Sequence, residues 1–418
     1  METIAFENLN TIYWYFWLFG LVNNVLYVVI LSAAVDLVGP NLPKSLVLLA
    51  NILPAFMIKL ASPFFIHEIS YPIRIFSIII MSFSGMLLVV NSSLHVCLLG
   101  IALASVSSGF GEVTFLQLTH YYKEMSLNGW SSGTGAAGLV GSGVYLVMTS
   151  LFHVSTELSL LIYSILPLTF LFYFQLKHNE YIKHNNDTAE PVLHEEVDGS
   201  SNGNSTLINS HVDDSINIFI DPNTLEYAQT HIKDTLRKLH ELILPYMLPL
   251  TSVYIFEYLI NQAVSPTLLF PINELESSVI LHHYRDMYVT YSMIYQFGVF
   301  ISRSTAGYFR LKNLYMLSVL QFLNLLLTLA QSWFYIIRSP WPVMMLIFYE
   351  GFLGGASYVN TFLNVLEEVN HDETEFALGS VSIADSLGIL IAAFIGLILE
   401  PTLCKHQIND GRPWCGMQ

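Results

Sequence analysis

Five ionisable residues lie inside long apolar runs of this sequence, where an ionised side chain is costly. Three are acids, Glu112, Glu257 and Glu350, and two are bases, Lys59 and Arg303. A charge at the centre of a membrane helix costs about 3 kcal/mol on insertion scales, so such residues usually face a protein interior or a water-filled cavity and mark a pathway. Buried carboxylates can exchange protons because burial disfavours their charged form. The pattern therefore predicts a substrate or proton pathway through a membrane.

Two asparagines extend this set and repeat with it along the chain. Asn24 and Asn261 lie in apolar runs 237 positions apart (261 − 24), while Glu112 and Glu350 are 238 positions apart (350 − 112). Two related halves joined by a polar loop are typical of transporters, whose substrate site lies between the halves near the middle of the membrane. Two alternatives stay open: the likeness is a coincidence between glycine-rich helices, and asparagines such as Asn24 only hydrogen-bond a neighbouring helix.

Small residues repeat every four positions in two of the apolar runs. That spacing puts them on one face of a helix, where they let another helix approach closely. We predict helix packing at both stripes, which are Gly129, Gly133, Ala137 and Gly141 in the first half and Ala384, Gly388, Ala392 and Gly396 in the second.

The first stripe overlaps a glycine pattern that imitates a dinucleotide-binding motif. Residues 133–138 read GTGAAG, and Glu157 follows at about the spacing of the acid that binds ribose. The true motif needs a strand before it and a βαβ unit around it, whereas apolar helical sequence lies on both sides here. We therefore exclude a dinucleotide cofactor.

The composition is that of a membrane protein. Hydrophobic residues make up 53% of the chain and charged residues only 11%, which lies outside the range of soluble domains. A helix needs about 20 mostly apolar residues to cross a bilayer. We predict an all-α polytopic membrane protein with about eleven transmembrane helices, at residues 12–38, 45–67, 73–92, 94–118, 130–152, 155–177, 241–270, 287–309, 313–337, 341–366 and 376–400.

Composition and motifs also exclude several functions. The net charge of −16, with few basic clusters, gives no support to nucleic-acid binding. Cys97, Cys404 and Cys415 form neither a metal-ligand pattern nor a disulfide framework. No metalloprotease, nucleophile or phosphate-binding motif occurs in a fitting context. We expect no metal, no cofactor and no enzymatic activity.

The chain divides into two pseudo-repeated membrane halves around a polar segment. Residues 1–177 form the N-terminal half, with about six helices, and residues 241–400 the C-terminal half, with about five. The segment 178–240 is polar, acidic and poor in aromatic residues, which predicts a largely disordered loop with a surface helix at Thr224–Leu239. Lysines and arginines are more numerous on the side that the N-terminus shares with this loop, so we predict that both are cytosolic.

The C-terminal tail, residues 401–418, leaves two alternatives open. An odd number of spans puts it in a lumen, where Cys404 and Cys415 could pair. The terminal Cys415-Gly-Met-Gln418 instead loosely fits a prenylation signal, although the first inner position lacks an aliphatic residue.

Several stretches of both halves resemble the battenin family of endolysosomal and vacuolar membrane proteins. The resemblance covers the membrane region, but not the long loop or the tail. It implies a fold similar to the major facilitator superfamily, residence in the lysosomal or fungal vacuolar membrane, and a part in lumenal pH balance and in handling basic amino acids or glycerophosphodiesters. The absence of a twelfth span departs from the superfamily pattern. The matching stretches, in the family's order, are FWLFGLVNN at 16–24 with LSAA at 31–34, GEVTFL at 111–116, WSSGTG at 130–135, YIFEYLINQ at 254–262 and YEGFLGGASYVNTF at 349–362.

Together these observations predict a secondary transporter that works by alternating access. Glu112, Glu257 and Glu350 would line a central cavity, and at least one would exchange protons with an acidic lumen. Lys59 and Arg303 either bind an anionic substrate group or pair with the acids inside the bundle. The partners are then membrane lipid, a small-molecule solute and protons. The alternative is a non-transporting regulator or scaffold of vacuolar pH or trafficking, which binds trafficking or proton-pump partners through residues 178–240.

Overall fold

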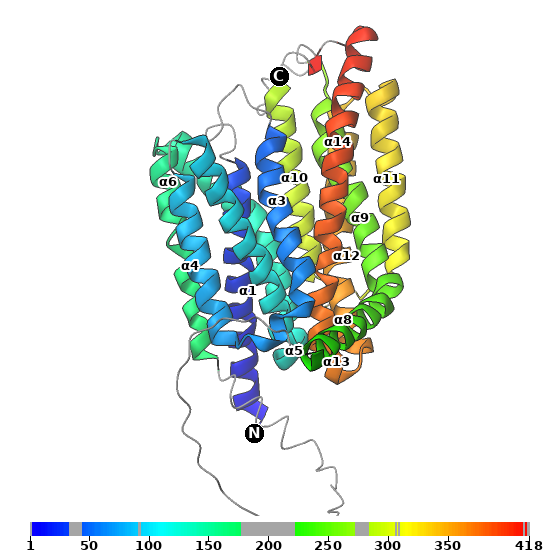
Figure 1. Ribbon diagram of the computed structural model, residues 1–418. Helices are drawn as coiled ribbons and strands as arrows, with labels where there is room; N and C mark the ends of the chain where they lie inside the picture. The colour runs from blue at the N-terminus through cyan, green and yellow to red at the C-terminus, as the bar shows by residue number, and fades with distance from the viewer. Residues whose placement is uncertain are drawn as a thin grey trace, which may run out of the picture.

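Helices make up the regular structure of the chain, and they run roughly along one common axis (Figure 1). The computed structural model describes residues 2–32, 44–90, 93–176, 222–271, 284–305, 307, 310–412 and 414–415, which contain no strand. The two termini lie at opposite ends of the bundle. Such a bundle suits a bilayer, because a helix satisfies its own backbone hydrogen bonds where no water is present.

The N-terminal half is built around one very long helix. This helix, α5 (Leu94–Leu146), packs against α1 (Glu2–Ser32), α3 (Lys44–Ala61) and α4 (Tyr71–Val89). Its backbone is not helical at Lys123 (φ 57°, ψ −152°), so two helices meet there. The half ends with α6 (Thr156–Tyr163) and a 3-10 helical stretch, Leu166–Gln175.

The C-terminal half begins at the end of the bundle that holds the N-terminus. There α8 (Pro222–Leu242) lies beside the short α13 (His371–Val381) (Figure 1). A π-helical turn at each end flanks α9 (Leu248–Leu259). The other helices are α10 (Tyr284–Thr305), α11 (Leu314–Phe334), α12 (Pro340–Glu368) and α14 (Ile383–Asn409). The halves meet where α3 packs on α14 and where α5 packs on α10, α12 and α13.

The prediction of an all-α membrane fold is confirmed. Among the described residues, eight helical stretches are long and apolar enough to cross a membrane, and one of them, Leu94–Thr149, has 56 residues. That length exceeds twice the roughly 20 residues that one crossing needs. The number eleven stays a prediction.

Several boundaries differ from those predicted. The spans predicted at 94–118 and 130–152 lie in one element, α5, and α3 ends at Ala61 rather than at residue 67. The last predicted span, 376–400, is interrupted at Ser382, where α13 ends and α14 begins, and α14 then continues to Asn409 in the predicted tail. The predicted surface helix is α8, while residues 33–38 of the first span and 178–221 of the polar segment lie outside the described residues.

The first stripe of small residues faces α1. A methyl group on Gly129, Gly133 or Gly141 would collide with α1, at backbone carbonyls for the first two and at valine side chains for the third. Ala137 is fully buried. The stripe therefore lies where two helices cross with little side-chain volume between them.

The second stripe lies on α14. Gly388 is so close to α9 that an added methyl group would meet the α9 backbone, whereas a methyl group on Gly396 would make only ordinary van der Waals contact. Ala384 and Ala392 are fully buried.

Candidate functional site

A cavity of about 140 Å³ lies between the two halves. Its walls come from α1, α3 and α5 on one side and from α9, α10, α12 and α14 on the other. Four of the residues predicted from the sequence line it, namely Asn24, Lys59, Glu112 and Arg303. The other three, Glu257, Glu350 and Asn261, lie elsewhere in the C-terminal half.

The amine of Lys59 connects two carboxylates from opposite halves. Its Nζ lies 2.7 Å from Oε2 of Glu112 on α5 and 3.1 Å from Oδ1 of Asp385 on α14. It also donates a hydrogen bond of 2.8 Å to Oγ of Ser386. Only 3% of the Lys59 side chain is exposed, so one buried cation joins the halves and two carboxylates share it.

Tyr358 of α12 forms a second link between the halves. Its hydroxyl donates to Oε1 of Glu112 at 2.9 Å and accepts from Nε1 of Trp130 at 3.1 Å. The guanidinium of Arg303 lies over the same ring, 4.1 Å from its centroid. Tyr358 therefore contacts Glu112 through its hydroxyl and Arg303 through the face of its ring.

Arg303 is held by hydroxyl groups. Nη1 donates to Oγ1 of Thr134 at 2.7 Å, and Nη2 donates to the hydroxyl of Tyr254 at 3.0 Å. In the described part of the chain no carboxylate lies within 4.0 Å of this guanidinium, and its Nε has no hydrogen-bond partner there. Arg303 thus brings to the cavity a positive charge that no described residue neutralises by a direct ion pair.

The glycine pattern at residues 133–138 lies against α10, the helix that carries Arg303. Gly135 lies against the aliphatic part of Arg303, and Gly138 lies against the amide of Gln296, both on α10. The pattern is inside a helix, so the βαβ context of a dinucleotide site is missing from it.

Glu257 and Glu350 lie between helices of the C-terminal half. Oε1 of Glu257 accepts a hydrogen bond of 2.6 Å from the hydroxyl of Tyr295. The Glu257 carboxylate occupies the space beside Gly354 of α12, where any side chain would collide with it. Glu350 precedes Gly354 by one helical turn and is fully buried. Of the three glutamates predicted to line a central cavity, Glu112 lines this one.

The two asparagines differ in position. Asn24 lines the cavity, and the amide of its neighbour Asn23 donates to the carbonyl of Ser108 at 3.1 Å, which joins α1 to α5. Asn261 is half-buried in the π-helical turn that follows α9.

Asp385 is not among the residues predicted from the sequence. It is a single carboxylate inside the last apolar run, next to Ala384 of the small-residue stripe. The rule that singled out Glu112 applies equally to it, because a charge at membrane depth needs a partner.

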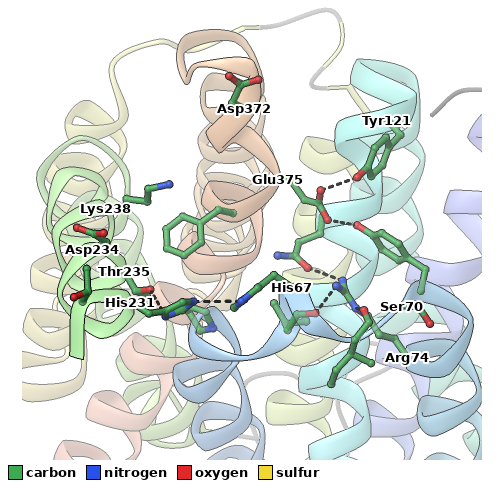
Figure 2. Close-up of a pocket in the computed structure, with 17 residues that line it drawn as sticks. His67, Ser70, Arg74, Tyr121, His231, Asp234, Thr235, Lys238, Asp372 and Glu375 are labelled. Carbon is green, nitrogen blue, oxygen red and sulfur yellow. Dashed lines mark hydrogen bonds between the residues drawn. The ribbon is translucent and has the colours of Figure 1, made fainter. Parts of the chain in front are cut away.

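A larger cavity, of about 650 Å³, lies at the end of the bundle near α8 (Figure 2). Here the hydroxyls of Tyr71 and Tyr121 donate to the two oxygens of Glu375 at 2.6 and 2.7 Å. Arg74 donates from Nη1 to Oε1 of Gln117 at 2.9 Å. The tyrosines belong to α4 and α5 and Glu375 to α13, so the network joins the halves at this end.

The helix α8 closes one side of that cavity. Nε2 of His231 lies 3.3 Å from Nε2 of His67 (Figure 2). Nζ of Lys238 lies 3.3 Å from Oε1 of Glu373. The segment that connects the halves thus contacts both of them.

At the opposite end, Cys404 and Cys415 form a disulfide. The chain between them folds back on the end of α11, where Nη1 and Nη2 of Arg412 donate to the carbonyls of Ser332 and Trp333 at 3.1 and 2.7 Å. Of the two alternatives for the tail, the structure contains the disulfide.

The two packed halves with a charged cavity between them are the architecture of the major facilitator fold. The solved structure of the major facilitator superfamily proton:xylose symporter XylE, bound to 6-bromo-6-deoxy-D-glucose, matches with a TM-score of 0.60 over 99% of this chain and 93% of XylE. At 11% sequence identity, this match shows the fold alone.

Sequence comparisons assign the chain to a family, which is a narrower group than the proteins that share its fold. The family model described as CLN3 protein matches residues 14–406, and the chain belongs to this CLN3 (battenin) family. Protein BTN1 of Saccharomyces cerevisiae is 58% identical over 98% of this chain and 99% of its own length. Protein btn-1 of Neurospora crassa is 43% identical over 96% and 90%, respectively. The resemblance seen in the sequence is confirmed.

Proposed function

We propose that the chain is a secondary transporter that moves a small solute across the vacuolar or lysosomal membrane by alternating access. The observation that carries this proposal is the cavity between the halves, into which Arg303 brings a positive charge that has no ion-pair partner among the described residues. An arginine of this kind suits a carboxylate or phosphate group, because its planar donors match the oxygens of such anions.

The network of Lys59, Glu112, Asp385 and Tyr358 connects substrate binding with the movement of the two halves. The contact of Lys59 with Asp385 and the contact of Tyr358 with Glu112 both join one half to the other. Both contacts must therefore break when the halves separate at these residues to open the cavity. Protonating a carboxylate of the network weakens its bond to Lys59. A ligand that binds one access state more tightly than the other shifts the population toward that state, and a proton or an anion can act in this way.

The substrates that we propose are basic amino acids or glycerophosphodiesters. A glycerophosphodiester would present its phosphate to Arg303. A basic amino acid would present its carboxylate to Arg303 and its cationic end to Glu112. Proton exchange at the same network would connect this transport with lumenal pH.

We further propose that the α8 end faces the cytosol and the disulfide end faces the lumen. The distribution of lysine and arginine favours this orientation. The Cys404–Cys415 bond supports it, because disulfides persist in oxidising compartments and are rare in the cytosol.

The test is uptake of a radiolabelled basic amino acid and of a radiolabelled glycerophosphodiester by the purified full chain in proteoliposomes. Arg303→Gln should reduce uptake about 10- to 100-fold, as expected for a lost hydrogen bond to a charged group. Arg338→Gln removes an exposed arginine outside the cavity and should leave uptake unchanged. If Arg303→Gln transports both solutes at the wild-type rate, the cavity is not the substrate site.

A further inference from the structure

Glu350 is in an environment that does not suit an ionised carboxylate. It is 0% exposed, and within the described residues neither oxygen has a hydrogen-bond partner. No nitrogen of a lysine, arginine or histidine lies within 4.0 Å of it in that part of the chain. An unpaired buried charge is strongly unfavourable, so such a group neutralises itself by taking up a proton.

A second buried carboxylate lies on the same helix interface. The carboxylate of Glu257 contacts Gly354, which follows Glu350 by four residues and so lies on the same face of α12. Oε2 of Glu257 also has no hydrogen-bond partner among the described residues. Two neighbouring carboxylates disfavour each other's ionisation, and one of them therefore retains a proton.

The ligand that fits this pair is a proton rather than a metal ion. Hard cations take six or more oxygen ligands, whereas the pair itself supplies four carboxylate oxygens, and one of these already accepts a hydrogen bond from the hydroxyl of Tyr295. In the described residues no group of three or more histidine, cysteine, aspartate or glutamate side chains is arranged to hold a metal.

Two polar side chains, Tyr288 and Glu400, lie toward the disulfide end and within electrostatic range of each other. Tyr288 of α10 interacts electrostatically with Glu350 and with Glu400 of α14. Glu400 is exposed. Helix α14 ends at the end of the bundle where the C-terminus lies (Figure 1), and Tyr288 and Glu400 both belong to the parts of their helices near that end.

Charged or titratable groups face the pair from α9, α10 and α14. Arg303 of α10 interacts with Glu257 but belongs to the central cavity. From α11 the polar residues nearby are uncharged, Gln321 and Asn324. The other titratable groups that interact with the pair are Tyr254 and Tyr258 on α9, Tyr288 and Tyr295 on α10, and Asp385 on α14. Glu400 of α14 interacts with Tyr288.

We propose that Glu350 is the proton-binding site of the transporter, that it is separate from the substrate cavity, and that protons reach it from the disulfide end past Glu400 and Tyr288. The inference rests on the proposed function only in assigning this proton to transport. Tyr295 stands between the two sites, because it lines the central cavity and also bonds Glu257. Loading or release of the proton can thus be sensed at the cavity wall.

The first experiment needs no substrate. A hydrophobic carbodiimide adds to a protonated carboxyl group within a membrane, and mass spectrometry of the labelled full chain locates the modified residue. In vesicles of fixed orientation, Glu350 should be labelled, and labelling should decrease when pH is raised at the disulfide end but not at the α8 end. Tyr288→Phe should slow that response. The proposal is overturned if Glu350 stays unlabelled at every pH or if its labelling follows the pH at the α8 end.

The second experiment assigns the proton to transport. Glu350→Gln imitates the protonated acid, so substrate exchange at equal pH should persist while accumulation driven by a pH gradient falls at least tenfold. Glu367→Gln, at a half-exposed position of the same helix, should keep both activities. Accumulation by Glu350→Gln at the wild-type level would overturn the assignment. Labelling of Glu350 in a wild-type protein that transports neither solute would instead reject the proposed function and leave the proton site standing.

Discussion

Replacing Lys59 by methionine tests the central network most directly. Among the described residues, Lys59 supplies the only nitrogen of a basic side chain within 4.0 Å of Glu112 and of Asp385. Without it, Glu112 keeps its hydrogen bond of 2.9 Å from Tyr358, and Asp385 keeps one of 2.6 Å from the amide of Ser386. Two carboxylates then remain buried without a cation.

The expected loss of stability is large. Removing one partner of a buried ion pair typically costs about 3–5 kcal/mol, because the other charge stays buried without compensation. A single lysine serves two carboxylates here, so we expect Lys59→Met to lie in the upper part of that range.

The assay is thermal unfolding of the purified full chain in detergent. Lys59→Met should unfold at a clearly lower temperature than the wild type. The triple variant Lys59→Met, Glu112→Gln, Asp385→Asn should recover most of the difference, since a neutral replacement of a whole buried ion pair is often nearly neutral in stability. Lys405→Met, which removes an exposed lysine, should have no effect. The reasoning is refuted if Lys59→Met unfolds at the same temperature as the wild type, or if the triple variant unfolds at as low a temperature as Lys59→Met.

Three further predictions concern the two ends of the bundle and the loop. Glu375→Gln removes the charged acceptor of Tyr71 and Tyr121. It should weaken closure at the α8 end and raise maleimide labelling of a cysteine placed at Ile66, a buried residue that lines this cavity, about tenfold or more; unchanged labelling would show that the network does not hold the halves together. The unreduced, denatured chain should present one reactive thiol, Cys97, and Cys404→Ser should present two, whereas three thiols in the wild type would exclude the disulfide. Deleting residues 178–221 while keeping α8 should preserve solute uptake, and loss of function with uptake intact would favour the regulator or scaffold.

The membrane fold follows from local sequence. Backbone groups in a bilayer must bond within their own segment, so a run of about 20 apolar residues specifies a helix wherever it lies in the chain. The small-residue stripes are also local, because a spacing of four puts Gly129 and Gly133 on one face. For the same reason Glu112, Lys59 and Arg303 could be singled out before any contact was known.

What the sequence left undecided is which of these charges meet. Lys59 and Asp385 are 326 positions apart, and no local pattern relates them; only the packing of α3 on α14 brings them together. Glu112 and Glu350 look equivalent in sequence, yet one lines the cavity and the other is enclosed between helices of its own half. The face that a helix turns toward a neighbour depends on how all the helices pack at once, and this packing alone decides whether a buried charge is an ion pair, a substrate ligand or a proton site.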